Sequence, residues 1–169
     1  AVKAAREFKE IAVVAIKHAN PCGIGSGKTV KEAFIKARDC DDESIFGGIV
    51  AVNRQVDEET ALLLHEIFLE IVVAPGFTDK ALEILESKKN IRLIELPDFN
   101  KFEIKRTCKE VLNGVIVGDY DNLLLDEDKL EFLTREKPTE EEMKDLKFAW
   151  ACVKPVSYTH LTLPTSDLV

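Results

Sequence analysis

Short apolar runs alternate with helix-like segments along the chain, and this alternation constrains the fold more than any other feature. Ile11–Ile16 (IAVVAI) is an uninterrupted apolar run with the length of one strand, as expected for a strand buried on both faces. Further strands are predicted at Phe46–Asn53, Ile71–Ala74, Ile91–Leu96 and Val111–Val117. Because most of these strands are separated by helical segments, the sequence predicts an α/β fold built in layers.

Capping residues mark where several of the predicted helices begin. Thr29 is followed by Glu32 and Thr139 by Glu142, which is the spacing of a capping box. Asp57 is expected to cap a helix that runs to about residue 69. The last predicted helix carries an apolar stripe that we expect to pack on the sheet. The stripe consists of Met143, Leu146, Trp150 and Val153.

The charge balance and hydropathy exclude several classes of partner. The net charge is −8, from 23 Lys and Arg against 31 Asp and Glu, which argues against a broad nucleic-acid interface. The sequence has no apolar run near the roughly 18 residues needed to span a bilayer. The first residues, AVKAAREFKE, do not resemble a signal peptide. We therefore expect a cytoplasmic protein without a nucleic-acid or membrane partner.

The cysteine pattern predicts reduced thiols and no metal site. Cys22, Cys40, Cys108 and Cys152 are widely spaced and form no CxxC pair, and the chain has only three histidines. Such spacing is typical of unpaired thiols in a reducing compartment. Cys22 is interpreted as a packing residue rather than a nucleophile.

The last fifteen residues, Pro155–Val169, differ in composition from everything before them. They contain one charged side chain, Asp167, and are rich in Thr, Ser, Leu and Pro. We interpret them as a non-native tail, similar to translated sequencing-adaptor read-through, and place the domain at residues 1–154. The alternative is a genuine apolar edge strand at HLTLP.

A glycine-rich segment, Gly23–Thr29 (GIGSGKT), follows a predicted strand and opens a helix. A phosphate-binding P-loop needs four residues between its first glycine and the Gly-Lys pair, and only three separate Gly23 from Gly27. The spacing therefore argues against a P-loop, although amides near a helix N-terminus could still hold one phosphate.

A second motif, Lys17–Gly23 (KHANPCG), directly follows the apolar run. The carboxyl ends of strands are where ligands collect in open α/β sheets, and a turn formed by Asn20-Pro21 with the glycines would bring Lys17 and His18 together. Histidine can relay a proton near neutral pH, and a neighbouring lysine can stabilise an oxyanion. A surface lysine beside a structural loop histidine is the alternative that this chemistry leaves open.

The motif and its surroundings resemble the transformylase domain of the bifunctional AICAR transformylase / IMP cyclohydrolase family. The resemblance starts with AVVAIKHANPCGIG and continues through three blocks in the family's order. These blocks are Ser44–Asn53 (SIFGGIVAVN), Glu66–Phe77 (EIFLEIVVAPGF) and Val111–Asn122 (VLNGVIVGDYDN). By this resemblance the chain is a layered α/β/α unit similar to cytidine deaminases, the first of the two units of the transformylase domain.

The resemblance implies transfer of a formyl group from 10-formyltetrahydrofolate, a co-substrate, to the 5-amino group of AICAR. It implies that Lys17 and His18 are catalytic and that His18 also contacts AICAR. Gly47, Glu70 and Asn20 are assigned to substrate binding on the same basis, with Asn20 expected to shape the turn. No metal is implied.

The family's cyclohydrolase domain and second α/β unit have no counterpart in these residues, so we expect a fragment that is inactive alone. Family members are homodimers, which the resemblance extends to the parent protein. The alternative function is a non-catalytic module that binds a nucleotide or anion through the Lys-His motif. A P-loop phosphohydrolase is a more distant third.

Overall fold

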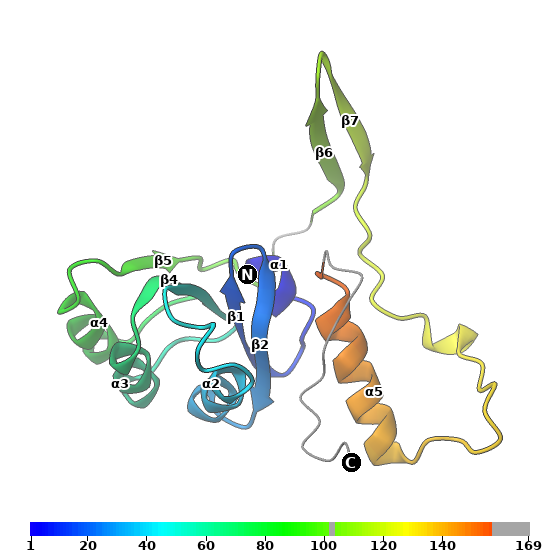
Figure 1. Cartoon of the computed structure of the whole chain (residues 1–169), viewed down its shortest axis with the longest axis horizontal. Helices are drawn as coiled ribbons and strands as arrows, with labels where there is room; N and C mark the ends of the chain where they lie inside the picture. The colour runs from blue at the N-terminus through cyan, green and yellow to red at the C-terminus, as the bar shows by residue number, and fades with distance from the viewer. Residues whose placement is uncertain (102–103, 157–169) are drawn as a thin grey trace.

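The computed structural model describes residues 1–101 and 104–156, in which a five-stranded sheet forms the centre of the body (Figure 1). Its strand order is β2-β1-β3-β4-β5. β1 is antiparallel to both β2 and β3, while β3, β4 and β5 run parallel to one another. The strands are β1 (Ile11–Lys17), β2 (Asn20–Gly27), β3 (Gly48–Val52), β4 (Leu69–Ala74) and β5 (Arg92–Glu95).

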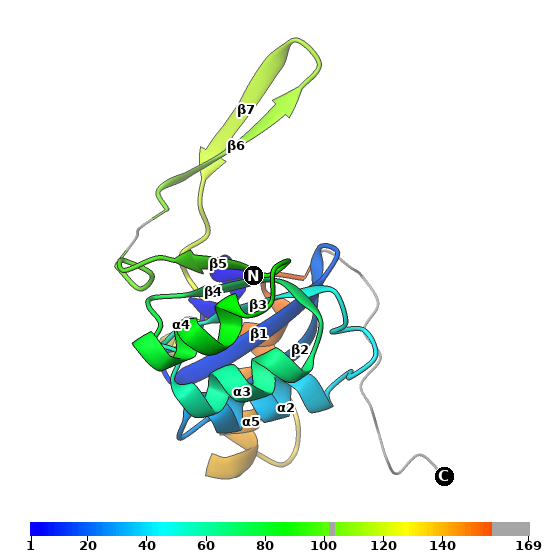
Figure 2. The same ribbon diagram turned by 90° about the vertical axis from the view of Figure 1, so that its left-hand side faces the viewer.

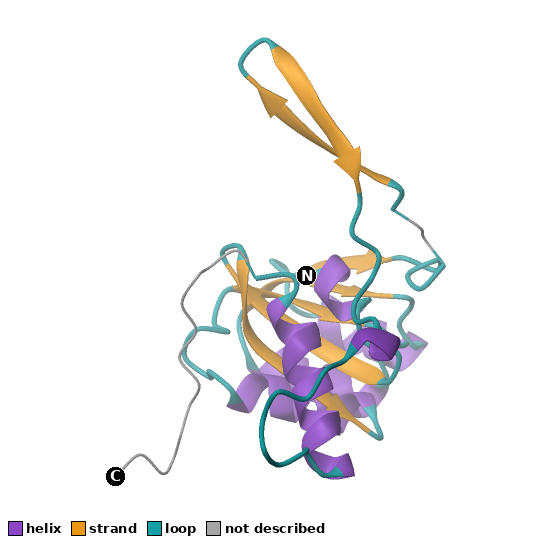
Figure 3. Ribbon diagram, turned by 90° about the vertical axis from the view of Figure 1, so that its right-hand side faces the viewer, coloured by secondary structure: helices purple, strands orange, loops and turns teal. Residues whose placement is uncertain are grey.

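Helices cover both faces of this sheet. Figure 2 shows α2, α3 and α4 on one face, and Figure 3 shows α1 and α5 on the other. The helices are α1 (Val2–Ala5), α2 (Val30–Asp39), α3 (Glu58–Glu66), α4 (Asp79–Glu86) and α5 (Glu140–Val153), with a short 3-10 turn, η1 (Glu127–Lys129). The arrangement confirms the predicted layered α/β/α fold.

β1 is the strand that connects the two halves of the core. Val13 and Ala15 pack with α2, α3 and α4, while Val14 and Ile16 pack with α1 and α5, and each is at most 7% exposed. Alternate residues of a strand point to opposite faces. The apolar run at residues 11–16 is therefore explained by burial on both sides of the sheet, as predicted.

Asn20–Gly27 forms strand β2, where the sequence predicts a turn formed by Asn20-Pro21 with the glycines. Gly23, Gly25 and Gly27 alternate along β2 and face α2. A Cβ atom at Gly23 would overlap the carbonyl oxygen of Ala37, and one at Gly25 would overlap that of Ala33. The glycines thus allow a helix to lie directly on the strand, which accounts for their spacing without a phosphate.

The predicted helix starts are confirmed at atomic detail. The side chain of Thr29 accepts a hydrogen bond from the N–H of Glu32, and that of Asp57 accepts one from Thr60. Thr139 and Glu142 form a complete capping box at the start of α5. Each cap satisfies a backbone donor that the first helical turn leaves unpaired.

α5 packs on the sheet through a different face from the one predicted. Ala151 is 3% exposed and Phe148 packs against Phe8, with 5.4 Å between ring centroids. Leu146 and Trp150 are each 56% exposed, so the prediction that their stripe faces the core is wrong. The small Ala151 lets the helix approach the sheet, while Leu146 and Trp150 are left on the outer side.

Val111–Val117 was predicted as one strand, but the chain reverses within it. β6 (Arg106–Val111) and β7 (Gly114–Asp119) form a hairpin that projects from the body (Figures 1 and 2). Because Val111 pairs with Gly114, the loop consists of the two residues Leu112 and Asn113, which is a common loop length in β-hairpins. The predicted tail lies outside the described residues from residue 157 onward. Within the described residues, no helix is long and apolar enough to cross a membrane.

We predict that Gly23→Ala lowers the free energy of unfolding by about 1–3 kcal/mol, the usual effect of overpacking a core. The added methyl group would meet backbone of α2, which cannot move as a flexible side chain can. Gly76→Ala is the matched control, because a Cβ atom added there would lie 3.8 Å from its nearest neighbouring atom. Urea denaturation of both variants tests this, and equal midpoints would contradict the packing role of Gly23.

Candidate functional site

The candidate site lies at the edge of the sheet where β1 ends. Because β1 is antiparallel to β3, with Ile16 opposite Ile49, its carboxyl end lies beside the amino ends of β3 and β4. The predicted site residues thus lie at the carboxyl end of β1 but at the amino ends of β3 and β4. In parallel sheets, ligands bind at the carboxyl ends of the strands. Because β1 is antiparallel to β3, the same edge of this sheet holds the carboxyl end of β1 and the amino end of β3.

His18 lies in a two-residue turn that joins β1 to β2. Lys17 pairs with Asn20 across this turn, and His18 has a φ of 59°. A positive φ at the first turn residue alone is the pattern of a type II′ hairpin turn. Such a conformation is uncommon for a residue with a Cβ, and residues under backbone strain cluster at functional sites. His18 is exposed at the tip of the hairpin, so the turn comes earlier than the predicted Asn20-Pro21 position.

The ammonium group of Lys17 is fixed by the chain that precedes β3. Its Nζ atom donates a hydrogen bond to the carbonyl oxygen of Phe46 over 2.6 Å. Gly47 follows with a φ of 65°, and a Cβ there would lie 3.0 Å from the same Nζ. Glycine is therefore favoured for its conformation and for the space it leaves to Lys17.

Gly47 also connects the chain before β3 to the start of β4. Its N–H donates to the carbonyl oxygen of Phe68 over 2.7 Å. The structure thus brings Lys17 and Gly47, two of the predicted site residues, into direct proximity.

Glu70 occupies a β-bulge at the same edge of the sheet. Gly48 pairs with Leu69 and Ile49 pairs with Ile71, which leaves Glu70 as an extra residue on β4. Bulges redirect a side chain out of the regular alternation of a strand. Glu70 is exposed, and its carboxylate is available to a ligand at this edge.

Asn20 is the one predicted site residue that is buried. It is 6% exposed and lies opposite Lys17 at the first position of β2. Cys22, two residues later, is the extra residue of a second bulge, because Ala15 pairs with Gly23 and Ile16 with Pro21. Burial of Asn20 fits its expected role in shaping the turn.

Two aromatic residues beside the site were not predicted from the sequence. The rings of Phe46 and Phe68 lie with centroids 5.2 Å apart, and these residues are 62% and 40% exposed. Phenylalanine is usually buried, so two adjacent exposed rings indicate an interaction surface beside the site. The one signal in the sequence was their proximity to predicted site residues: Phe46 directly precedes Gly47, and Phe68 lies two residues before Glu70.

The cysteine near the site is not activated. Burial is the main cause that raises the pKa of the Cys22 thiol, and burial raises the pKa of Cys152 to about 12. A raised pKa lowers the fraction of thiolate at neutral pH, and thiolate is the nucleophilic form. This supports the interpretation of Cys22 as a packing residue.

Two backbone amides at the start of α2 are already paired within the chain. The N–H of Lys28 donates to the carboxylate of Glu32, and the N–H of Glu32 donates to the hydroxyl of Thr29. These two amides are therefore not free to hold a phosphate at this helix N-terminus. The described residues also contain no group of three or more His, Cys, Asp or Glu side chains that could hold a metal ion.

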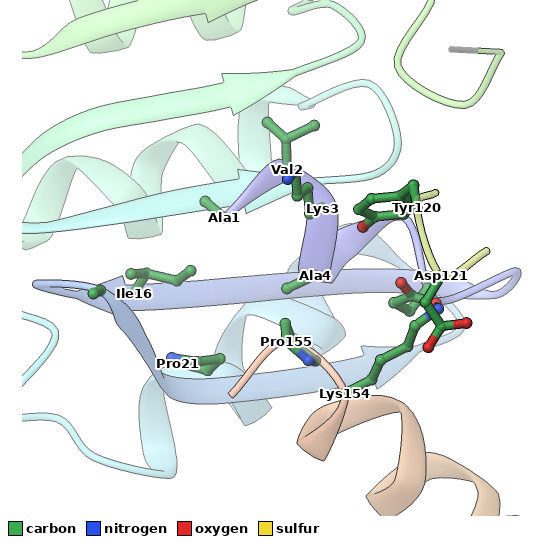
Figure 4. Close-up of a pocket in the computed structure, with 12 residues that line it drawn as sticks. Ala1, Val2, Lys3, Ala4, Ile16, Pro21, Tyr120, Asp121, Lys154 and Pro155 are labelled. Carbon is green, nitrogen blue, oxygen red and sulfur yellow. The ribbon is translucent and has the colours of Figure 1, made fainter. Parts of the chain in front are cut away.

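A cavity of about 550 Å³ lies behind the β1–β2 turn (Figure 4). Ala19 and Pro21 line it on the hairpin side, but Lys17 and His18 do not. Lys154 and Glu7, which also line it, form an ion pair 3.1 Å long. This cavity therefore lies on the opposite side of the turn from the candidate site, and neither Lys17 nor Gly47 lines it.

Comparison with known proteins identifies the family. The model of the AICARFT/IMPCHase bienzyme matches residues 1–160. The chain belongs to this family. It is 46% identical over 168 residues to the "Bifunctional purine biosynthesis protein PurH" of Bacillus mycoides (strain KBAB4) and 50% identical over 172 residues to that of Anoxybacillus flavithermus (strain DSM 21510 / WK1).

The family match covers far more of this chain than of its relatives. Both alignments include 99% of the chain but 33% of the relative, so the chain spans about a third of their length. A dCMP deaminase from the cyanophage S-TIM5, in its apo form, aligns with 51% of the chain and 79% of the deaminase. That alignment has a TM-score of 0.41 at 14% sequence identity, too low to carry an argument.

We predict that the four cysteines react with iodoacetamide in an order set by burial. At pH 8, a thiol with a pKa of about 12 is thiolate in about one molecule in 10⁴. Cys152 should therefore be alkylated last, Cys22 slowly, and the exposed Cys108 and Cys40 first. Peptide mass spectrometry follows each site, and unfolding in urea should make the rates similar. Rapid alkylation of Cys22 in the folded protein would contradict its assignment as a packing residue.

Proposed function

We propose that this chain is part of an AICAR formyltransferase, with Lys17 and His18 as its catalytic residues. The observation that carries the proposal is the position of Lys17, whose Nζ atom is held 2.6 Å from the Phe46 carbonyl and next to Gly47. This contact lies within the KHANPCG motif and the region of the family match. The family membership supports a role in purine biosynthesis.

The chemical task is to activate a poor nucleophile. The 5-amino group of AICAR has a lone pair delocalised into the ring and its carboxamide. Formyl transfer forms a bond from this nitrogen to the formyl carbon, breaks the bond from that carbon to N10 of the folate, and moves a proton from the amine to N10. A positioned side chain that relays this proton lowers the barrier.

Lys17 and His18 suit the two parts of this task. The Lys17 ammonium has three donor hydrogens, and the Phe46 carbonyl uses one of them. The others are available to a substrate oxygen, where they would stabilise a tetrahedral oxyanion. His18, exposed at the adjacent turn, would contact AICAR and relay the amine proton. Either His18, or Lys17 in its neutral amine form, would accept that proton first.

The remaining predicted residues would bind or orient AICAR. Gly47 would let the backbone approach the substrate, and the Glu70 carboxylate would accept hydrogen bonds from it. The buried Asn20 would not contact the reacting groups but would fix the turn that carries His18. In this proposal, 10-formyltetrahydrofolate is the co-substrate, no metal takes part, and the parent enzyme is a cytoplasmic homodimer.

We predict that the purified 169-residue chain shows no detectable formyl transfer. Transition-state stabilisation needs every group placed around both substrates, and this chain corresponds to a third of the length of its relatives. The assay supplies AICAR and 10-formyltetrahydrofolate and measures formylated product. Turnover by the chain alone would show that the folate site is complete within it.

In a full-length enzyme that contains this segment, Lys17→Ala and His18→Ala should each lower kcat by roughly 10²–10⁴-fold, as for a positioned proton-transfer group. The double variant should be little worse than the poorer single variant, because the two residues act as a unit. Lys28→Ala is the control and should leave kcat nearly unchanged, since the Lys28 side chain is exposed at the start of α2.

Steady-state kinetics of these four variants, compared with the wild-type enzyme, decide between the candidate functions. Nearly unchanged turnover in both single variants would favour the module that binds an anion without catalysis. A Lys28 variant as inactive as the His18 variant would favour the P-loop.

A further inference from the structure

The end of α4 is joined to the segment that connects α3 to β4. The Nζ atom of Lys88 donates a hydrogen bond to the carbonyl oxygen of Ile67 over 2.8 Å, although the two residues are 21 positions apart in the sequence. Ile67 is the residue at which α3 ends, and the last carbonyl groups of a helix have no partner within it. Lys88 therefore supplies one of the missing partners, and its positive charge is favourable at this end of a helix.

The backbone that carries the Lys88 side chain is itself fixed. The N–H of Lys88 donates to the carbonyl oxygen of Leu85, a buried core residue, and the carbonyl oxygen of Lys88 accepts from the N–H of Ile91. A second contact joins the ends of α3 and α4, in which Nε2 of His65 lies 2.9 Å from Oγ of Ser87. The two helices lie side by side on one face of the sheet (Figure 2). Their packing therefore does not depend on Lys88 alone.

The contact of Lys88 lies one residue away from the candidate site. Phe68 directly follows the carbonyl group that Lys88 holds, and its own carbonyl oxygen accepts the N–H of Gly47 over 2.7 Å. The carbonyl oxygen of Phe46, the residue before Gly47, accepts a hydrogen bond from Nζ of Lys17 over 2.6 Å. Three hydrogen bonds and the backbone between them thus connect the end of α4 to the ammonium group of Lys17.

We propose that Lys88 is a positioning residue for the binding of AICAR. By holding the end of α3, Lys88 fixes the start of β4, and with it the backbone of Gly47 and the carboxylate of Glu70. Both groups would bind AICAR in the proposed function, so this inference rests on that function. Lys88 itself acts through the carbonyl of Ile67 and has no contact with the substrate in this proposal.

In a full-length enzyme that contains this segment, Lys88→Met should raise the KM for AICAR by roughly tenfold, since a small misplacement of binding groups by a distant mutation can cost as much as about 10²-fold. The KM for 10-formyltetrahydrofolate should stay nearly unchanged, and kcat should fall by a smaller factor. Lys88→Arg should restore the KM for AICAR, because it keeps the charge and the donor hydrogens. Lys89→Met is the matched control, because it removes the same charge from the next residue, which is exposed.

Initial rates over a range of each substrate give the two KM values. A variant that only reduces the amount of folded enzyme lowers the maximal rate and leaves both KM values unchanged. That result for Lys88→Met would overturn the proposal, as would failure of this variant to fold. An equal change of KM in Lys89→Met would also overturn it.

Lys17→Ala in the same assay tests the proposed function separately. If Lys17→Ala keeps the kcat of the wild-type enzyme, the proposed function fails and the role of Lys88 fails with it. If Lys17→Ala loses turnover as expected but Lys88→Met keeps the wild-type KM for AICAR, the role of Lys88 alone is overturned.

Discussion

Burial of β1 on both faces is the constraint from which the rest of the structure follows. Val13 and Ala15 are closed off by α2, α3 and α4, and Val14 by the layer that holds α1 and α5. If β1 shifted by one residue relative to its neighbours, every side chain would point to the opposite face of the sheet. Val13 and Ala15 would then face α1 and α5, and Val14 would face α2, α3 and α4. The position of β1 is therefore fixed along its whole length. Since Lys17 is its last residue and the turn after it has two residues, the positions of Lys17 and His18 are fixed as well.

Departures from regular structure concentrate at the edge that β1 fixes. Both bulges of the sheet's described part, at Cys22 and Glu70, lie there, and so do the positive φ values of His18 and Gly47. The positive φ of His18 costs some stability, and strain of this kind persists only where the surroundings enforce it. Proteins commonly break local rules at functional sites. The clustering of four such features around Lys17 supports the location of the candidate site independently of the motif.

Local sequence signals predicted the parts of the fold that depend on neighbouring residues. The apolar run at residues 11–16 and the caps at Thr29, Asp57 and Thr139 were predicted correctly because each involves a few consecutive positions. The contact between Lys17 and Phe46 joins residues 29 apart in the sequence, and no local pattern specifies it. The site residues were proposed through the family resemblance, and the bulge at Glu70 and the aromatic pair beside Gly47 needed the three-dimensional structure.

The error on α5 shows what periodicity can and cannot determine. An apolar stripe at helical spacing predicts that a helix has a contact face, but not which surface it contacts. α5 has two apolar sides: Phe148 and Ala151 pack on the body, while Leu146 and Trp150 lie on the outer side. Trp150 still uses its indole N–H, which donates to the carbonyl oxygen of Leu124 over 2.6 Å, so its ring is oriented although exposed. A helix that is apolar on both sides is typical of one buried between two layers, and the described residues supply one of them. The helical spacing thus predicted the helix and its apolar stripe, and the mistake was to assign that stripe to the sheet, because Leu146 and Trp150 are exposed.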